Sequence, residues 1–208
     1  MNNKCLMEFI GTFFLVFVVG LTVIGGAGAM APLAIGTILM VMVYAGGHIS
    51  GGHYNPAVTL AVWMRGKCDS KDVGGYWSAQ FSAAIVAALL VGYLKHGSMV
   101  VTMEPNLIHA FIVEFIFTFA LAFVVLNAAT SKDTAGNSFY GLAIGFTVMA
   151  SAYAAGQISG GAFNPAVALG ITLMGLTKLP MLFIFFLGNF AGGALAAKVF
   201  VLLNPHDV

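Results

Sequence analysis

The chain repeats itself, because several short segments of its first half recur in its second half at one constant spacing. Leu33–Gly36 matches Leu142–Gly145, and Ile49–Gly52 matches Ile158–Gly161, each at an offset of 109 residues. An Asn-Pro-Ala-Val box that begins at Asn55 returns at the same offset. The two halves are therefore predicted to share one local fold, and any architecture of the whole chain must contain that fold twice.

Composition places both halves in a membrane. The chain is 60% hydrophobic and 7% charged, whereas soluble domains are about half apolar and about a quarter charged. A membrane-spanning helix needs about 20 apolar residues. Six segments are predicted to span: 6–25, 32–48, 74–94, 107–128, 139–156 and 179–203. Two shorter apolar segments, 56–64 and 165–174, are predicted half-helices that enter the bilayer without crossing it, with their free backbone groups buried in protein or facing water.

The number of spans in each half fixes how the halves are related. We place repeat 1 at about 1–97 and repeat 2 at about 106–208, so the whole chain forms a single channel-like domain. Near the start of each half, Glu8 in the first span resembles Glu114 in the fourth, at an offset of 106 residues rather than 109. Three spans per half force the second half to enter the membrane from the opposite side. The predicted fold class is an all-α membrane protein with six transmembrane helices and two re-entrant half-helices in an inverted repeat, which places a solute site near the bilayer midplane.

The two Asn-Pro-Ala boxes are the candidate pore centre. They comprise Asn55, Pro56 and Ala57, and Asn164, Pro165 and Ala166. Each asparagine is predicted to cap a half-helix, with proline at the first helical position. One Asn-Pro alone indicates only a turn. Two such boxes in an inverted repeat direct the positive N-terminal ends of two helices at the bilayer midplane. These positive ends repel cations. The asparagine amides can also donate to a passing water and interrupt a proton wire.

These motifs resemble the aquaporin, or major intrinsic protein, family over nearly the whole chain. The similarity rests on the Glu-x-x-x-Thr of spans one and four, on both boxes with their Ser-Gly-Gly approach, and on the Ala-Gln pair at 79–80. It implies a right-handed six-helix bundle, one pore per protomer and a homotetramer. It also implies that Glu8 and Glu114 accept hydrogen bonds from the re-entrant loops, and that His53 holds the first loop in place.

The chain departs from that family at the selectivity filter. Most members carry an arginine directly after the second box, where this chain has Val167, and the family's spacing places the other filter positions at Ile35, Ala152 and Gly161. We expect a wide filter of low polarity. It resembles that of some plant tonoplast intrinsic proteins, which pass water, urea, ammonia or hydrogen peroxide, although those proteins have histidine where this chain has Ile35. Glycerol facilitators carry aspartate where this chain has Ala168.

The resulting functional hypothesis is a passive channel for water and small uncharged solutes that excludes protons and ions. A glycerol, urea or ammonia facilitator with water as a secondary solute is one alternative, and an ion-coupled secondary transporter is a second. An enzyme is not expected, because no nucleophile, base or carboxylate pair converges on one site. No cofactor or metal site is expected, since His48 and His53 have no third ligand candidate nearby.

Charge and cysteine usage bear on partners and location. The formal net charge is +1 and the basic residues are scattered, so the expected partners are the lipid bilayer and neutral solutes, with no nucleic acid. The basic residues favour both termini in the cytoplasm, in what we expect to be a microbial plasma (inner) membrane. Arg65, Lys67 and Lys71 are expected to face the cytoplasmic surface, and Cys5 and Cys68 to be free thiols.

Overall fold

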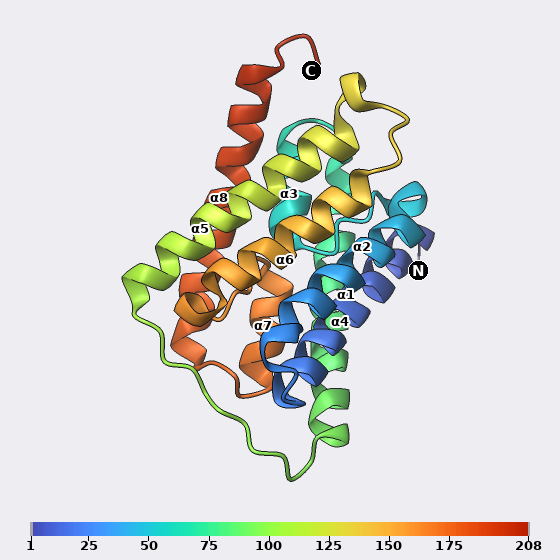
Figure 1. Cartoon of the computed structure of the whole chain (residues 1–208). Coiled ribbons are helices and arrows are strands. Elements are labelled where there is room, and N and C mark those ends of the chain that lie inside the picture. The colour runs from blue at the N-terminus through green and yellow to red at the C-terminus, as the bar shows by residue number, and fades with distance from the viewer. Residues whose placement is uncertain (1, 208) are drawn as a thin grey trace.

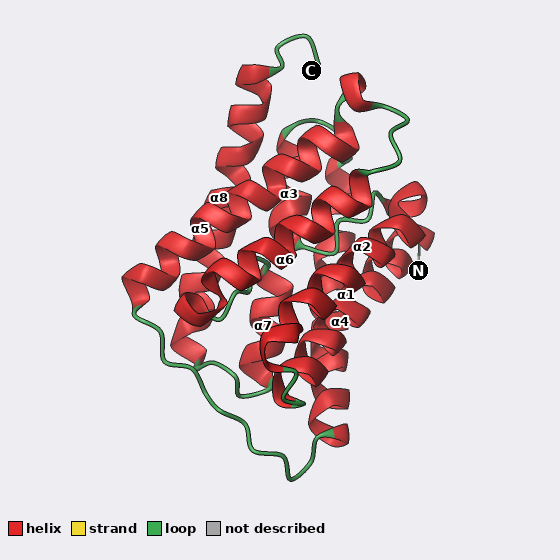
Figure 2. Cartoon of the chain, viewed as in Figure 1, coloured by secondary structure: helices red, strands yellow, loops and turns green. Residues whose placement is uncertain are grey.

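A computed structural model describes residues 2–207, and helices joined by loops make up this range, with no strand in it (Figure 2). The eight α-helices are α1 (Asn3–Ile24), α2 (Ala31–Ser50), α3 (Pro56–Met64), α4 (Ser70–Leu94), α5 (Leu107–Val125), α6 (Tyr140–Ser159), α7 (Pro165–Leu173) and α8 (Leu179–Leu203). Short helical turns cover Gly28–Met30 and Lys132–Thr134, and Leu126–Thr130 continues α5 as a π-helical turn. Six helical segments are long and apolar enough to cross a membrane, which confirms the predicted fold class.

The helices pair in the same way in both halves. Helix α1 packs on α2 and α4, and its counterpart α5 packs on α6 and α8, while α2 and α6 meet across the boundary between the halves. The short helices are exchanged between the halves, because α3 packs on α8 and α7 packs on α4. In Figure 1, α3 and α7 lie in the middle of the bundle, one above the other. The inverted repeat therefore encloses the two half-helices at its centre.

Glycines allow the two halves to approach each other closely. A methyl group added to Gly36 of α2 would lie 2.6 Å from the carbonyl oxygen of Gly145 in α6, and one added to Gly145 would lie 2.5 Å from the carbonyl oxygen of Gly36. Gly193 of α8 stands in the same relation to Ala57 in α3, at 2.6 Å. Small residues at such crossings let helix backbones pack directly against each other, as is common between membrane helices.

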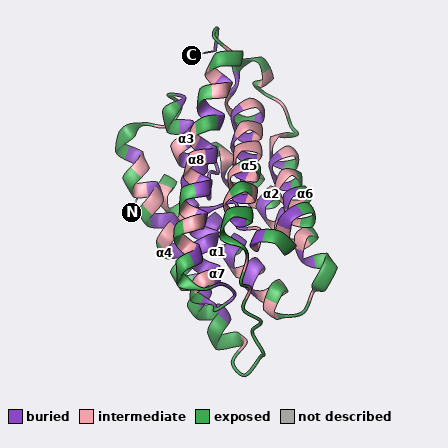
Figure 3. Ribbon diagram, turned by 90° about the vertical axis from the view of Figure 1, so that its left-hand side faces the viewer, coloured by how far each residue is buried: buried purple, intermediate pink, exposed green. Residues whose placement is uncertain are grey.

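The distribution of buried residues is that of a membrane protein. Large apolar side chains face outward, with Leu89 69% and Phe183 71% exposed, whereas Gln80 and Asn189 are fully buried. Figure 3 shows the buried residues concentrated along the inner faces of the helices and the exposed ones along the outside and the chain ends. Since no water reaches the hydrocarbon core, buried polar groups must satisfy one another inside the protein.

Two local expectations need correction. Helices α2 and α6 end at Ser50 and Ser159 rather than at residues 48 and 156, because Gly51 and Gly160 adopt left-handed conformations, with φ of 91° and 100°, that close the last turn. The expectation that Arg65 faces the surface is wrong, since this residue is only 3% exposed. The guanidinium of Arg65 forms its hydrogen bonds with groups inside the protein, so it does not need water as a hydrogen-bond partner.

Candidate functional site

The two boxes form helix caps of matching geometry. The side-chain oxygen of Asn55 accepts hydrogen bonds from the backbone of Ala57 at 2.9 Å and of Val58 at 3.4 Å. The oxygen of Asn164 accepts from Ala166 and Val167 at the same two distances. Pro56 and Pro165 occupy the first positions of α3 and α7, where the missing N–H of proline costs nothing. Each asparagine oxygen is thus fully used as a cap.

The amide nitrogens of the two asparagines join the boxes to each other. Asn55 donates to the carbonyl oxygen of Phe163 at 2.9 Å, and Asn164 donates to the carbonyl oxygen of Tyr54 at 2.8 Å. The two half-helices therefore begin side by side with their N-termini facing. A side-chain amide carries two N–H groups, so each asparagine retains one N–H beyond this cross-link. The sequence pattern predicted that the boxes face each other but gave no sign of the cross-link.

Two buried carboxylates hold the loops that lead into the boxes. Glu8 of α1 accepts hydrogen bonds from the Ser50 hydroxyl at 2.7 Å, from the backbone of His53 at 2.9 Å and of Tyr54 at 2.7 Å, and from the Gln80 amide at 2.8 Å. All four donors lie on the first half of the chain. Glu8 thus links three elements by hydrogen bonds: its own helix α1, helix α4, and the loop that precedes α3.

Glu114 of α5 makes the same set of contacts in the second half. Its donors are the Ser159 hydroxyl at 2.8 Å, the backbone of Ala162 at 2.9 Å and of Phe163 at 2.6 Å, and the Asn189 amide at 2.7 Å. Like Glu8, it is fully buried. A buried carboxylate with four donors directed at it is a structural anchor rather than a free base.

The residue before each asparagine adopts an unusual backbone conformation. Tyr54 and Phe163 both have φ of 47°. This value lies in the left-handed region, which residues other than glycine and asparagine rarely occupy. Their N–H groups bind Glu8 and Glu114, and their carbonyls accept the crossing asparagine amides. The carboxylates therefore maintain the strained turn that directs each carbonyl at the opposite box.

The predicted filter positions and both asparagines border one cavity. This main cavity has a volume of about 570 Å³. Its lining includes Ile35, Ala152, Gly161, Val167, Asn55 and Asn164. Within the described residues, no Asp, Glu, Lys or Arg contributes to that lining. The main cavity is therefore mostly apolar, and its polar groups are amides, hydroxyls, the imidazole of His53 and backbone groups.

The segment between the halves also reaches the main cavity, which the sequence analysis missed. Met103 lines it, and the backbone N–H of Met103 donates to Leu176 at 2.9 Å. The Thr102 hydroxyl donates to Gly175 at 2.7 Å, and Lys178 and Glu104 form an exposed ion pair beside it, of a kind that contributes little to stability. A connecting segment with no helical periodicity gives no signal from which this return to the pore could be predicted.

His53 lies between the main cavity and a second cavity. Its ring nitrogen Nδ1 is 3.1 Å from the Thr59 hydroxyl, and its ring packs against that of Tyr76. The second cavity, of about 420 Å³, is also lined by Lys4, Thr130 and both Asp69 and Asp72, among others. Residues 2–207 contain no cluster of three or more histidine, cysteine or acidic side chains that could bind a metal.

Comparison with known proteins gives a consistent result. The profile of the family described as Major intrinsic protein matches residues 1–200. Aquaporin NIP1-4 of Oryza sativa subsp. japonica is 37% identical over 210 residues, covering 96% of this chain and 76% of that protein. Glycerol uptake facilitator protein-like 6 of Lactiplantibacillus plantarum is 37% identical over 219 residues, covering 99% and 100%. The crystallographic aquaglyceroporin of Plasmodium falciparum superposes with a TM-score of 0.84 at 22% identity, over 98% of this chain and 97% of that one.

Proposed function

The chain belongs to the major intrinsic protein family, whose members are passive membrane channels and not enzymes. From this premise we propose that the chain passes water and small uncharged solutes while excluding protons and ions. One observation carries the proposal. The amides of Asn55 and Asn164 cross-link the N-termini of α3 and α7 at the wall of the main cavity. The site residues proposed for the pore centre are therefore the six residues of the two boxes.

The electrostatics of the cross-linked helix ends support exclusion of ions. Each helix N-terminus carries a partial positive charge of about half an elementary charge. Two such ends meet where the cavity offers no carboxylate among the described residues. A cation there would lose hydration worth several kcal/mol without a compensating ligand. The remaining N–H of each asparagine orients the oxygen of a passing water, which turns its hydrogens outward and interrupts a proton wire.

The filter is proposed to be wide and uncharged. Ile35, Ala152, Gly161 and Val167 all border the main cavity, and none of them carries a formal charge. The name of one relative, a glycerol uptake facilitator, supports passage of solutes larger than water. The same name is consistent with the alternative of a glycerol, urea or ammonia facilitator. Among the described residues, the lining of the main cavity contains no Asp, Glu, Lys or Arg, and His53 is its only imidazole. The lack of a carboxylate to bind a coupling ion favours a passive channel over an ion-coupled transporter.

Fluxes of several solutes through one preparation test this function. Purified protein in liposomes is expected to raise water, urea and glycerol permeability above that of empty liposomes, without saturation at high solute concentration. Stopped-flow light scattering measures all three. Uptake of any of these solutes that requires an imposed ion gradient would support the transporter instead. Permeability equal to that of empty liposomes for every solute would contradict a channel of any kind.

Ion exclusion is a separate prediction. Planar bilayers containing the protein are expected to show no proton or potassium current above background, although the filter lacks arginine. The cause is the pair of positive helix ends at Asn55 and Asn164, together with the apolar lining. Voltage clamp with proton and potassium gradients makes the measurement, and solute flux from the same preparation serves as the control for active protein. Sustained current through conducting protein would refute the exclusion mechanism.

Oligomeric state and orientation stay predictions. We propose a homotetramer with both termini in the cytoplasm, as the family resemblance and the distribution of basic residues indicate. Lys4, near the N-terminus, and Thr130, which contacts Arg65 beside the C-terminal tail, both line the second cavity. This places the two ends of the chain on the same side of the bundle. The second cavity is accordingly proposed to be the cytoplasmic mouth of the pore.

A further inference from the structure

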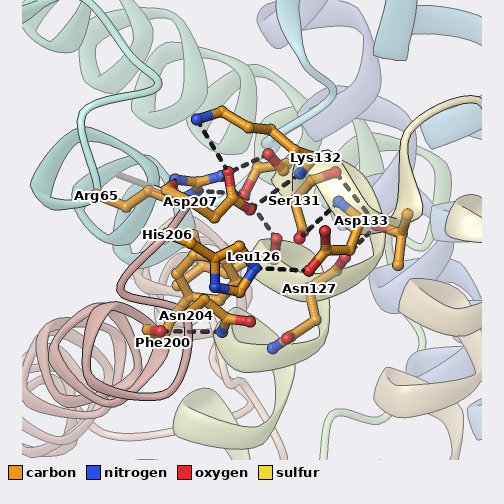
Figure 4. A network of polar contacts seen from close by, with 12 residues as sticks. Arg65, Leu126, Asn127, Ser131, Lys132, Asp133, Phe200, Asn204, His206 and Asp207 are labelled. Atoms are coloured by element: carbon orange, nitrogen blue, oxygen red, sulfur yellow. Dashed lines mark hydrogen bonds and ion pairs between the residues drawn. The ribbon is translucent and has the colours of Figure 1, made fainter.

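The only arginine of the chain lies buried beneath the C-terminal tail. Arg65 ends helix α3, and Asp207 lies beyond the end of α8. Both side chains are fully buried, and the Arg65 guanidinium is 3.3 Å from the Asp207 carboxylate. Figure 4 shows the tail folded back so that Asp207 points at Arg65. A turn in which the Asp207 N–H donates to Asn204 at 3.0 Å makes this direction possible.

The Arg65 guanidinium connects three parts of the chain. One Nη donates to the Asp207 carbonyl oxygen at 2.7 Å. Nε donates to the Thr130 hydroxyl at 2.6 Å, and the other Nη donates to the Thr130 carbonyl oxygen. The guanidinium also lies 4.5 Å from the ring centre of Phe200. The planar fork of arginine, with five N–H donors, suits several acceptors held at fixed angles.

Asp207 is held by the α5–α6 connection as well as by Arg65. Its carboxylate accepts the backbone N–H of Lys132 at 2.9 Å. Burial alone would raise the pKa of this carboxyl, but hydrogen bonds from Ser131 and Lys132 and the guanidinium of Arg65 outweigh burial and lower the pKa to about 2. Next to it, His206 contacts Asp133 at 2.9 Å in an exposed pair. The tail is therefore fastened at two successive residues.

Thr130 links this cluster to the pore. It is the last residue of the π-helical turn Leu126–Thr130 and borders the second cavity. Its hydroxyl donates to the Leu126 carbonyl oxygen at 2.6 Å and accepts from Arg65. Without Asp207, Arg65 would be a buried charge with no counter-ion, and a charge in that state must move toward water or be neutralised. Movement of Arg65 would remove both of its hydrogen bonds to Thr130.

We propose that Arg65, with Asp207 as its counter-ion, is a positioning residue for the pore, because it fixes the Thr130 wall of the second cavity and so sets the width of that mouth. The proposal rests on the channel function proposed above. The tail residues Asn204–Asp207 act as a strap over this end of the bundle, and the shape of the mouth depends on the strap being in place. Arg65 itself does not contact the solute.

Three substitutions test the strap through the ratio of urea to water permeability. Asp207→Asn removes the counter-charge at constant size, Arg65→Lys keeps the charge but lacks the fork, and Thr130→Val removes the hydroxyl that Arg65 binds. Each is expected to change the ratio by about twofold to thirtyfold, the range over which buried contact networks modulate a distant site. A purely stabilising role would reduce the amount of folded channel and lower both permeabilities equally, so the ratio would stay constant.

Lys132→Ala is the matched control. Its ammonium lies 3.9 Å from the same Asp207 carboxylate, but its side chain is 57% exposed, so the ratio is expected to equal that of the wild type. The wild-type ratio is also expected to stay constant between about pH 4 and pH 8. Asp207 has a lowered pKa in the folded protein, so the stabilisation it provides is complete above the ordinary carboxyl pKa of about 3.9 and is lost only as the pH falls through its folded value.

The outcomes separate the two proposals. Wild-type protein that conducts neither water nor urea would refute the channel function itself. Wild-type protein that conducts both, with Asp207→Asn, Arg65→Lys and Thr130→Val all at the wild-type ratio, would refute the role of Arg65 alone. A change of the wild-type ratio near neutral pH that His206→Ala abolishes would also overturn the proposal, because it would assign control of the mouth to the exposed His206–Asp133 pair.

Discussion

Glu114→Ala is expected to prevent the second half of the channel from holding its native loop, which should be the largest effect of any single substitution considered. The change leaves the Ser159 hydroxyl, the N–H groups of Ala162 and Phe163, and the Asn189 amide without their acceptor. Each buried donor left unpaired costs about 1–3 kcal/mol. The summed loss rivals the total stability of a typical domain, about 5–15 kcal/mol. We expect a strongly lowered melting temperature in detergent and negligible water flux.

Three comparisons sharpen this experiment. Glu8→Ala should behave in the same way, because Glu8 holds the first loop with an equivalent set of four donors. Glu114→Gln keeps the size of the side chain but turns an amide toward N–H donors, so it should lie between alanine and the wild type. Glu104→Ala removes a carboxylate that is 66% exposed, and it should change neither melting nor flux. Normal melting of Glu114→Ala would show that this carboxylate is not the anchor of the loop.

Val167→Arg is expected to convert a wide filter into a narrow one. Val167 follows the second box, is 5% exposed and lines the main cavity beside Gly161. A guanidinium there would occupy space now open to solute and would bind the carbonyl groups of the adjacent loop. Urea and glycerol permeability should fall by about tenfold or more, since a tenfold decrease requires only about 1.4 kcal/mol of added barrier. Water, which is smaller, should lose much less.

Val167→Leu is the matched control for this substitution, because it adds bulk without charge or donors. It should lower urea and glycerol permeability less than arginine does. The informative quantity is again the ratio of each solute to water in stopped-flow measurements on proteoliposomes. If Val167→Arg left urea and glycerol fluxes unchanged with normal water flux, the assignment of Ile35, Ala152, Gly161 and Val167 as the filter would be wrong.

The position of the sole arginine distinguishes this chain from the usual pattern of its family. In most members of the family, an arginine directly after the second box lines the filter, whereas in this chain that residue is Val167. The one arginine present instead ends the other half-helix, α3, where it binds Thr130 and Asp207 away from the main cavity. The proposed filter therefore carries no fixed positive charge, and we propose that its selectivity depends on size and on backbone carbonyls.

Much of the fold could be predicted because duplication and apolar length are properties of the sequence. The constant offset of 109 residues, the six apolar segments and the two Asn-Pro-Ala boxes determined six spans, two half-helices and an inverted arrangement. The similarity of the residues around Glu8 and Glu114, at an offset of 106, indicated that these two carboxylates occupy equivalent places. These inferences needed no knowledge of which side chains touch, because the bilayer restricts spanning segments to helices that satisfy their own backbone.

Only the tertiary structure decided which distant groups bind one another. Asn55 and Phe163 are 108 positions apart, and Arg65 and Asp207 are 142 apart. Hydrophobic periodicity records which face of a helix is buried but not which partner covers it. The grouping of Arg65 with Lys67 and Lys71 predicted surface exposure. That prediction was wrong because burial of an ion depends on a counter-ion, which the chain brings to it only on folding. The same reason hid Met103, whose segment has no pattern until the loop after α7 provides its hydrogen-bond partners.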